Sequence, residues 1–456
     1  MDAEQNPTHP SNGNAHDLAL FTDLYELTML QAYFEEGLTQ PAAFSLAVRT
    51  LPPGRNFLLA CGIDELLGQL ERLRFEARHL DYLASLGLFR EAFLDRLARL
   101  RFTGEVYAVA EGTPVFADEP ILEVVAPLPE AQLIETLVIN QVHLATVLAS
   151  KAVRVVRAAA GRPVMDFGAR RMHGIDAAVQ GARAQYIAGV AATSNLLAGR
   201  RYGIPVAGTM AHSYIQAHGD ERGAFAAFAR LYPETVLLVD TYDTLAGIDR
   251  VIALAQRLGA AFRVRAVRLD SGDLVALAKA ARTRLDAAGL ERVQIIASGG
   301  LDEDSVAATL AAGAPVDRFG VGTRMGVARD APDLDMAYKL CEYAGEGRLK
   351  LSTGKPVLPG RKQVFRVEED GRDVRDVIAR ADEPLPGRPL LEPVMRGGRR
   401  TQAAAPLTAL RERARQRIAR LPDAVQANAP AEPPYPVAVS AALRAYQDAV
   451  RKAIAG

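Results

Sequence analysis

The sequence predicts an α/β protein in which a parallel β/α region is combined with an α+β part. Two observations predict this class. Between residues 163 and 325, six apolar runs alternate with Ala-rich helical segments at the spacing of βα units. On either side of this region, short β-prone runs are separated by Gly and Pro turns, which is typical of antiparallel pairing. The length of 456 residues also suggests two or three domains.

Composition excludes several classes of protein. Lys plus Arg and Asp plus Glu both number 54, so no bulk positive charge favours nucleic acid or an anionic membrane. The two cysteines, Cys61 and Cys341, lack CxxC spacing and predict neither disulfides nor zinc. No leader pattern and no run of apolar residues long enough for a membrane span is seen, so we expect a cytoplasmic protein without nucleic-acid or membrane partners.

The first elements are helical. Residues 1–17 are polar, with Pro and Gly, and predict a disordered tail. Residues 23–37 place apolar side chains at near-helical spacing and stop at Gly37, a typical helix end. Residues 63–100 read as amphipathic helices, and residues 104–127 as a small antiparallel unit. We assign residues 18–140 to an N-terminal α+β domain.

The predicted β/α region spans residues 141–340. After a long helical run that ends at Gly161, the six predicted strands are PVMDFGARR, IPVAGTMAHS, TVLLVDTYDT, VRAVRLDSGD, VQIIASGG and VDRFGVGTR. Each is apolar at its start and polar or Gly-rich at its end. Because the carboxyl ends of parallel strands meet at one edge, these polar residues are expected to converge there. Six strands leave open an incomplete barrel or a doubly wound sheet.

The C-terminal third is expected to return to the first domain. Residues 341–400 read as a β-ribbon with Gly and Pro turns, which would join the N-terminal domain. Residues 401–456 predict C-terminal helices interrupted by a Pro/Ala linker at 424–437.

Two glycine clusters at late strand ends indicate a phosphate site. They contain Gly299 and Gly300 in SGG and Gly322 and Thr323 in GVGT. Glycines there let backbone N–H groups approach a phosphate, next to a helix N-terminus. The alternative is a pair of tight turns without a ligand. GVGTRMG is late and misspaced for a dinucleotide fingerprint, and no P-loop is present.

Charged residues follow two other strands. Arg268 could bind a carboxylate or phosphate, and Asp270 and Asp273 could contact ribose hydroxyls or hydrated Mg²⁺. Arg170 and Arg171 follow the first strand. For each of these residues the alternative is a structural ion pair or a helix cap.

His212 follows the second predicted strand, between Thr209 and Ser213. It could be a general base, a metal ligand or a nucleophile, because imidazole is reactive near neutral pH. His218 is expected to be solvated or to pack against neighbouring side chains. His173 is intermediate between His212 and His218 as a candidate functional residue. No HxxxH spacing links them, which argues against a metal site formed by protein side chains. Between residues 163 and 325 the one lysine is Lys279, in a helix, which disfavours a Schiff-base enzyme.

Seven motifs together resemble the nicotinate phosphoribosyltransferase family. They are TDLYELTM, DFGARR, GTMAHSY, VDTYDT, RLDSGD, ASGGLDE and FGVGT, in this order between Thr22 and Thr323. The resemblance implies an irregular, incomplete (β/α) barrel with an additional α+β domain built from N-terminal and C-terminal segments. It also implies formation of nicotinate mononucleotide and diphosphate from nicotinate and 5-phosphoribosyl-1-diphosphate, coupled to ATP hydrolysis, in NAD salvage. Mg²⁺, ATP as co-substrate and a homodimer with shared active sites are implied as well.

The resemblance assigns roles by motif position. His212 matches the histidine that is transiently phosphorylated by ATP, and Tyr25 the aromatic residue that contacts nicotinate, from the other subunit. Thr209 and Arg268 match the nicotinate pocket, and Gly322 and Thr323 the 5-phosphate site. Weaker matches are Arg170, Arg171, Ser213, Asp270, Gly299 and Gly300. Some relatives carry Asn-Asp where this chain has Gly299-Gly300, so here that loop would contribute backbone contacts.

Three alternatives stay open at this point. A phosphoribosyltransferase of the same fold could act on nicotinamide or on quinolinate, although quinolinate needs a clamp for its second carboxylate. A protein that binds a phosphorylated ligand without catalysis would also place polar residues at strand ends. Product analysis separates these alternatives.

Overall fold

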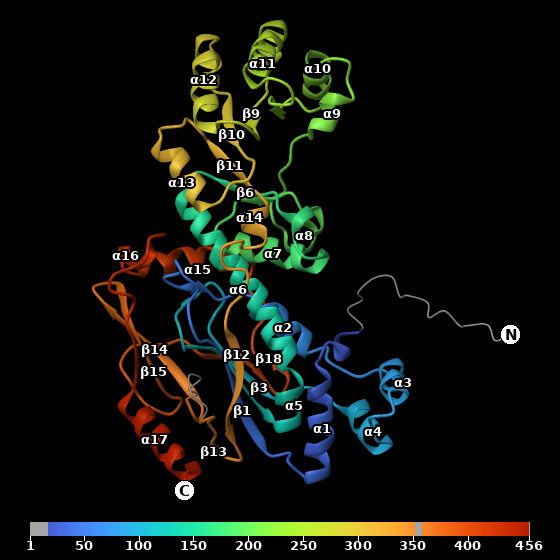
Figure 1. The fold of residues 1–456 in the computed structure, drawn as a ribbon, viewed down its shortest axis with the longest axis vertical. Coiled ribbons are helices and arrows are strands. Elements are labelled where there is room, and N and C mark those ends of the chain that lie inside the picture. The colour runs from blue at the N-terminus through green and yellow to red at the C-terminus, as the bar shows by residue number, and fades with distance from the viewer. Residues whose placement is uncertain (1–16, 352–357, 456) are drawn as a thin grey trace, which may run out of the picture.

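The protein is described by a computed structural model that covers residues 17–351 and 358–455. Apart from Asp17, the predicted N-terminal tail lies outside these residues. Figure 1 shows two lobes that share the long helix α6 (Glu135–Ala158). Within the described ranges, α6 is the one helix with the length and apolar composition of a membrane span, and 72% of its most apolar window is buried inside the protein. It therefore serves as a core helix that connects the lobes.

The lower lobe begins with the predicted helical elements. Helix α1 (Leu24–Glu36) ends at Gly37, whose φ of 74° is left-handed, as expected for a glycine cap. The other N-terminal helices are η1 (Leu18–Leu20), α2 (Ile63–Leu70), α3 (Ala77–Ser85), α4 (Glu91–Arg99) and α5 (Leu128–Leu133).

The main sheet of this lobe combines both ends of the chain. Its order is β13-β12-β1-β5-β3-β17-β18. The N-terminal members are β1 (Pro41–Val48), β3 (Glu105–Ala108) and β5 (Pro120–Pro127). The C-terminal members are β12 (Met336–Tyr343), β13 (Glu346–Gly347), β17 (Glu392–Arg396) and β18 (Arg399–Arg400). Because β12 pairs with β1 and β17 with β3, both antiparallel, the predicted α+β domain of N- and C-terminal segments is confirmed.

Two smaller sheets complete the lower lobe. A four-stranded sheet has the order β16-β14-β15-β19, with β14 (Lys362–Glu369), β15 (Arg372–Arg380), β16 (Arg388–Pro389) and β19 (Val437–Val439). A two-stranded sheet pairs β2 (Leu58–Leu59) with β4 (Pro114–Val115). The last helices are α15 (Leu407–Arg420), α16 (Asp423–Gln426) and α17 (Ala441–Ala455). The C-terminal region thus adds a strand, β19, to the predicted helices.

The upper lobe contains the parallel sheet, with the order β7-β6-β11-β10-β9-β8. Its strands are β6 (Val164–Asp166), β7 (Ala192–Thr193), β8 (Val236–Leu238), β9 (Ala266–Leu269), β10 (Gln294–Ala297) and β11 (Arg318–Val321). The terminal strands β7 and β8 are not paired with each other, so the barrel is incomplete, as predicted.

Five of the six predicted parallel strands are confirmed, and the one expected at residues 204–213 is wrong. The sixth strand is β7, and the predicted segment only forms a single bridge between Val206 and Thr193. Pro205 has no N–H to donate and Gly208 weakens an extended run, so pairing stops after one residue. The following loop carries Thr209 and leads into α9.

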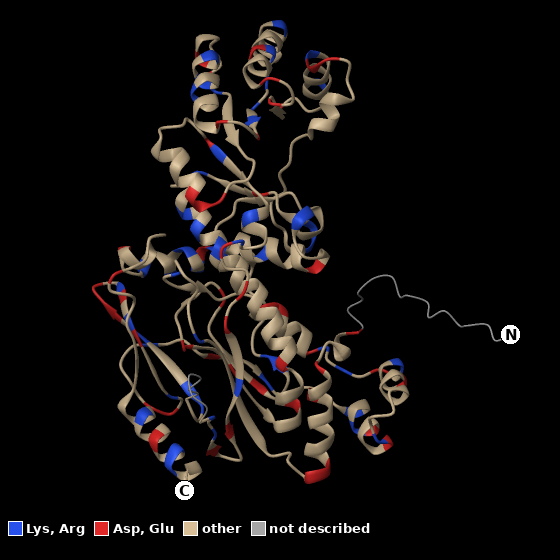
Figure 2. Cartoon of the chain, viewed as in Figure 1, with Lys and Arg blue, Asp and Glu red and all other residues tan. Residues whose placement is uncertain are grey.

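Helices cover one face of the parallel sheet (Figure 1). The helices of the upper lobe are α7 (Ile175–Ile187), α8 (Leu196–Tyr202), α9 (His212–Gln216), α10 (Glu221–Leu231), α11 (Thr244–Leu258), α12 (Leu274–Ala287), α13 (Glu303–Ala311) and α14 (Thr323–Gly326), with η2 (Ala169–Arg171) and η3 (Gly259–Ala261). On the other face Met165, Ala192, Ala266 and Ile296 form a small apolar cluster. Charged residues of both signs are interspersed along the chain in both lobes (Figure 2).

The domain limits drawn from sequence remain predictions. Strand β12 begins at Met336 and pairs with β1, although the predicted β/α region extends to residue 340.

Candidate active site

Arg268, at the end of β9, is the centre of a polar cluster at the carboxyl edge of the parallel sheet. Its Nη1 donates to Thr209 Oγ1 at 2.7 Å and its Nε donates to Ser298 Oγ at 3.1 Å. Its Nη2 lies 3.2 Å from Asp270 Oδ1, and its guanidinium carbon lies 5.9 Å from the centre of the Phe167 ring. The side chain is 14% exposed, so the guanidinium is fixed in one orientation but can still be reached from the edge.

Asp270 is held as a carboxylate. Burial acts to raise its pKa, but the hydrogen bond from Ser298 Oγ, at 2.5 Å from Oδ1, and the charges of Arg268 and His212 lower it below the ordinary value. The second oxygen, Oδ2, lies 3.9 Å from His212 Nε2. Asp270 therefore places a negative charge between the arginine and the histidine.

His212 is the first residue of α9 and joins the same cluster. Its Nδ1 lies 3.1 Å from Thr241 Oγ1, within hydrogen-bond distance. The side chain is 39% exposed. The Nε2 atom is too far from Asp270 for a hydrogen bond and remains accessible. One imidazole nitrogen is thus anchored while the other faces the open edge.

Two buried aspartates, Asp240 and Asp166, hold the turns at the carboxyl edge of the parallel sheet in place. Asp240 Oδ2 accepts the Asp270 N–H at 2.9 Å and the Ser271 hydroxyl at 2.6 Å. Asp166 Oδ1 accepts the Gly168 N–H at 2.8 Å, and its Oδ2 accepts the Thr193 hydroxyl at 2.7 Å. These bonds fix the turns after β9 and β6, from which the functional side chains project.

The glycine loop after β10 requires Gly299. This residue has φ 93°, and a Cβ there would lie 1.8 Å from the Asp270 carbonyl oxygen. Gly300 also has a positive φ of 66°, but no atom lies within 4 Å of its Cβ direction. The loop can therefore approach the β9 turn closely only because Gly299 has no side chain.

The second glycine cluster follows β11. Thr323 Oγ1 accepts from Arg171 Nη1 at 3.2 Å, which links the β11 turn to the β6 turn. A Cβ at Gly322 would lie 3.1 Å from the Phe167 carbonyl oxygen, so these two turns also pack closely. Arg170 has no side-chain hydrogen bond or ion pair with any described residue. A threonine, two arginines and a glycine turn therefore share one corner of the edge.

The other predicted site residues lie outside this cluster. Asp273 Oδ1 accepts the N–H groups of Val275 and Ala276 and so caps α12. Ser213 is exposed, and within the described chain its hydroxyl has no partner. Tyr25 lies on α1 in the other lobe, 47% exposed. Its predicted role therefore requires a second subunit.

The remaining histidines differ from His212. His218 packs against the Tyr214 ring at 4.8 Å between ring centres, and His173 is exposed without a polar partner in the described ranges. Nowhere in residues 17–351 or 358–455 do three or more His, Cys, Asp or Glu side chains form a group suited to a metal ion.

Sequence reasoning missed four contributors to the cluster: Thr241, Asp240, Ser298 and Phe167. A signal was present for each, because all four belong to motifs at strand ends that were recognised as a set. Their contacts with Arg268 and His212 could not be assigned, because long-range packing places the ends of β8 and β10 next to β9 and brings Phe167, after β6, to Arg268.

Comparison with known proteins identifies the family. The N-terminal domain model of nicotinate phosphoribosyltransferase matches residues 20–143, and the nicotinate phosphoribosyltransferase family model matches residues 163–372. A Mycobacterium tuberculosis protein named nicotinate phosphoribosyltransferase pncB2 is 58% identical over 93% of this chain and 92% of its own length. The Bacillus subtilis nicotinate phosphoribosyltransferase is 41% identical over 81% of this chain and 77% of its own.

Two solved structures share the fold. The crystal structure of human nicotinic acid phosphoribosyltransferase has a TM-score of 0.85 at 28% identity, over 94% of this chain and 99% of that one. Nicotinate-nucleotide pyrophosphorylase from Pyrococcus furiosus has a TM-score of 0.74 at 25% identity, over 90% and 98%. With both lobes matched in sequence and in fold, this chain belongs to the nicotinate phosphoribosyltransferase family.

Proposed function

We propose that this protein transfers the 5-phosphoribosyl group from 5-phosphoribosyl-1-diphosphate to nicotinate, releasing nicotinate mononucleotide and diphosphate, with coupled ATP hydrolysis. Family membership and the names of the relatives support the reaction. The single observation that carries it is the orientation of Arg268 by Thr209, Ser298 and Asp270 at the open edge of the sheet.

Arg268 is suited to the nicotinate carboxylate. Three of its neighbours fix the guanidinium plane, which reduces the entropy lost when a ligand binds. A planar guanidinium with remaining N–H donors matches a carboxylate geometrically. The Phe167 ring beside it offers a flat apolar surface for the pyridine ring. In this arrangement the pyridine nitrogen, meta to the carboxylate, would point away from Arg268 toward the ribosyl C1.

The β11 corner is suited to the 5-phosphate. Gly322 gives access to backbone N–H groups, the Thr323 hydroxyl is a donor, and Arg171 already contacts Thr323. Arg170 adds a further cation. On the other side, the loop of Gly299 and Gly300 contributes backbone contacts to the ribosyl or diphosphate group.

The residues present also fit Mg²⁺. Asp240 Oδ1 is buried and has no hydrogen-bond partner among the described atoms, and Asp270 keeps a free, ionised oxygen. Mg²⁺ prefers one or two carboxylates together with substrate phosphates, so these two aspartates would hold it. When bound, the ion neutralises the diphosphate leaving group. Asp273, as a helix cap, is less suited to this role.

His212 is proposed to accept a phosphoryl group from ATP. With Nδ1–H donating a hydrogen bond to Thr241 Oγ1, the Nε2 lone pair is free to attack the γ-phosphorus. The N–P bond forms as the bond to the β-phosphate oxygen breaks, and ADP leaves with that electron pair. Water later cleaves the N–P bond and releases phosphate. Between these steps the added charge lies beside Asp270 and alters the affinity of the edge for its anionic substrates.

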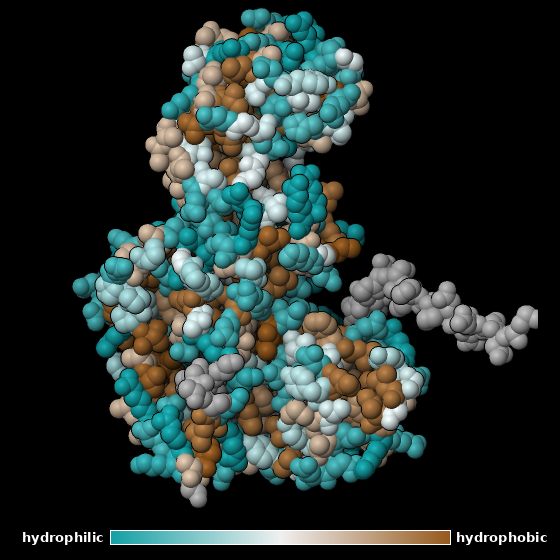
Figure 3. Space-filling model, viewed as in Figure 1, coloured by the Kyte–Doolittle hydropathy of each residue, from teal (hydrophilic) through white to brown (hydrophobic). Residues whose placement is uncertain are grey.

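The working form is proposed to be a cytoplasmic homodimer. Ile175, Leu196 and Leu197, on the contacting helices α7 and α8, are 75%, 74% and 51% exposed. Apolar side chains are visible on the outer side of α8 (Figure 3). A second copy that covered them would bury this surface and could bring its Tyr25 to the nicotinate pocket. Both cysteines are free and buried, as suits a reducing compartment.

A base-competition assay tests the proposal. The purified protein is supplied with 5-phosphoribosyl-1-diphosphate, Mg²⁺ and equal concentrations of nicotinate, nicotinamide and quinolinate, with and without ATP. We expect nicotinate mononucleotide and diphosphate in equal amounts, with ATP increasing the yield. Preference for another base, or binding without diphosphate release, would refute it.

A further inference from the structure

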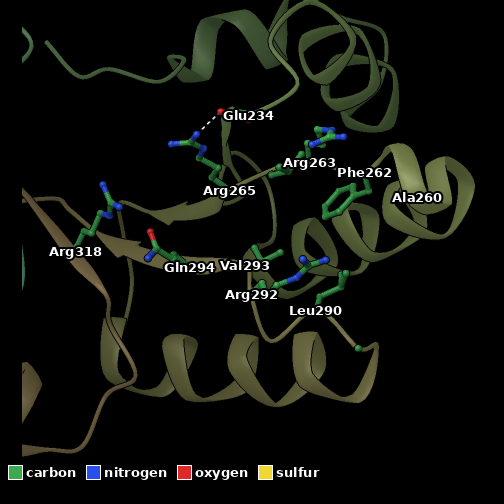
Figure 4. Close-up of a pocket in the computed structure, with 12 residues that line it drawn as sticks. Glu234, Ala260, Phe262, Arg263, Arg265, Leu290, Arg292, Val293, Gln294 and Arg318 are labelled. Carbon is green, nitrogen blue, oxygen red and sulfur yellow. Dashed lines mark hydrogen bonds and ion pairs between the residues drawn. The ribbon is translucent and has the colours of Figure 1, made fainter.

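A cavity lies at the amino edge of the parallel sheet, opposite the edge that carries the Arg268 cluster (Figure 4). Its volume is about 590 Å³, and the residues that enter β8, β9, β10 and β11 line it. Four of them are arginines: Arg263, Arg265, Arg292 and Arg318. We infer that this cavity binds an oligophosphate, a chain of two or more phosphoryl groups, at a site separate from the Arg268 cluster.

The position of the cavity separates it from the proposed catalytic edge. Arg265 immediately precedes β9, whereas Arg268 lies near its end. Arg318 begins β11, whereas Gly322 and Thr323 follow it. Since a strand advances about 3.3 Å per residue, four-residue strands place the two edges roughly 10 Å or more apart. Both sites therefore belong to one sheet without sharing a functional side chain.

The charge of the cavity is strongly one-sided. Glu234 is its single acidic lining residue, against four arginines, which leaves three positive charges without a counter-charge in the lining. The whole chain is neutral, with 54 residues of each sign. A local excess of this kind focuses a positive potential in a concave surface, where it attracts a multivalent anion.

Internal contacts do not account for these arginines. Arg265 is paired with Glu234, but Arg263, Arg292 and Arg318 have no side-chain hydrogen bond or ion pair in residues 17–351 and 358–455. Backbone carbonyl groups at this edge also need hydrogen-bond donors, which arginine side chains can supply. That need is met by Arg282, which donates to the carbonyls of Leu290 and Val293 at 2.9 and 2.7 Å. Three guanidinium groups thus remain available to a ligand.

The shape and chemistry favour phosphates over other anions. Guanidinium groups bind phosphate oxygens in pairs, and three of them at one cavity can contact successive phosphoryl groups of a chain. Cavities of about 300–1,000 Å³ are typical of small-molecule sites. Phe262 and Leu290 add an apolar wall, visible beside Arg292 in Figure 4, that would accommodate a base attached to the chain.

A neighbouring cavity shares Glu234 and Arg263 with this site and extends to Gly208 and Thr209. Thr209 also contacts Arg268, so a ligand in this neighbouring cavity could approach both anion sites. The test must therefore report on the arginines of the amino edge themselves rather than on total binding.

Phenylglyoxal labelling of arginines, mapped by mass spectrometry on the full chain, gives this readout. Arg263 and Arg292 are exposed and can react, and Arg396 and Arg399, exposed in the other lobe, are the internal reference. At inorganic triphosphate about ten times its Kd, occupancy should slow labelling of Arg263 and Arg292 about tenfold, with the reference unchanged. ATP should protect as well. If ATP protects at a lower concentration than triphosphate, the natural ligand is a nucleotide; if triphosphate does, it is a free oligophosphate.

Variants complete the test. Arg292→Ala/Arg318→Ala should weaken triphosphate protection of Arg263 by about 100-fold, since each removes a charge-assisted bond, whereas Arg396→Ala/Arg399→Ala should not. Equal protection by sodium chloride at matched ionic strength, protection by adenosine alone, or unchanged affinity in the double variant would overturn the inference. The labelling needs no turnover, so its outcome is independent of whether the proposed transferase activity is found.

Discussion

Replacing Arg268 by alanine tests whether this side chain binds the carboxylate of nicotinate. In the native protein the guanidinium is oriented by Thr209, Ser298 and Asp270, so its bond to a ligand carboxylate is formed without further ordering. A hydrogen bond to a charged group contributes about 1.5–3 kcal/mol, which corresponds to about 10- to 150-fold in affinity. We expect the KM for nicotinate to rise by that factor.

Nicotinamide separates this role from general damage to the site. It has the same ring but no carboxylate, so its inhibition constant as a competitor should change much less than the KM for nicotinate. The assay is initial-rate formation of nicotinate mononucleotide at fixed 5-phosphoribosyl-1-diphosphate, with nicotinamide added as competitor. Arg284→Ala on α12, which removes an exposed ion pair with Asp249 on α11, is the matched control and should alter neither value.

A different outcome would refute the reasoning. If Arg268→Ala weakened nicotinate and nicotinamide equally, Arg268 would shape the pocket without distinguishing the carboxylate. If it left the KM for nicotinate unchanged, the carboxylate would be bound elsewhere.

Further predictions concern the histidine, the glycine loop and a buried acid. His212→Asn should retain slow ATP-independent transfer and lose ATP hydrolysis, measured as ADP release; stoichiometric ADP in the variant would contradict the phosphohistidine. Thr241→Val removes the oxygen that binds His212 Nδ1 and should slow histidine phosphorylation about fivefold, roughly 1 kcal/mol, with Thr241→Ser restoring it; equal rates for both variants would exclude this positioning role. Gly299→Ala, whose Cβ would lie 1.8 Å from the Asp270 carbonyl oxygen, should lower kcat/KM at least about tenfold. Gly300→Ala has open space around its Cβ, so its one expected penalty is backbone strain, which should lower the free energy of unfolding by about 1–3 kcal/mol at most. Burial of Glu26 raises its pKa from 4.5 to about 7 in the folded protein, so the stability it contributes is present below pH 4.5 and is lost as the pH rises to about 7. The free energy of unfolding, measured with urea and taken relative to Glu26→Gln, should therefore fall by about 3 kcal/mol across that range, and a flat difference would contradict the shift.

The sequence predicted the local elements of the fold well because each has a local cause. Helix α1 ends where Gly37 permits a left-handed turn, and five parallel strands were visible as apolar runs with polar ends. The predicted strand at 204–213 failed because apolar content alone does not reveal that Pro205 cannot donate to a neighbour. The true edge strand, β7, is two residues long and carries almost no pattern.

Individual residues of the candidate site were predicted from the sequence, but their contacts with one another were not. His212, Thr209, Arg268 and Asp270 do meet in one cluster. Their order around it depends on the strand order β8-β9-β10, which follows from long-range packing rather than from local sequence. Asp273 illustrates the limit: a carboxylate after a strand has the same sequence pattern whether it contacts a ligand or, as here, caps the following helix.

The most direct test of the account is the stoichiometry of the complete reaction. The protein is incubated with nicotinate, 5-phosphoribosyl-1-diphosphate, Mg²⁺ and ATP, and nicotinate mononucleotide, diphosphate and ADP are quantified together. We expect one diphosphate per nicotinate mononucleotide, ADP formation that requires His212, and little product when nicotinamide replaces nicotinate. Diphosphate release without nicotinate mononucleotide, or equal use of both bases, would contradict it.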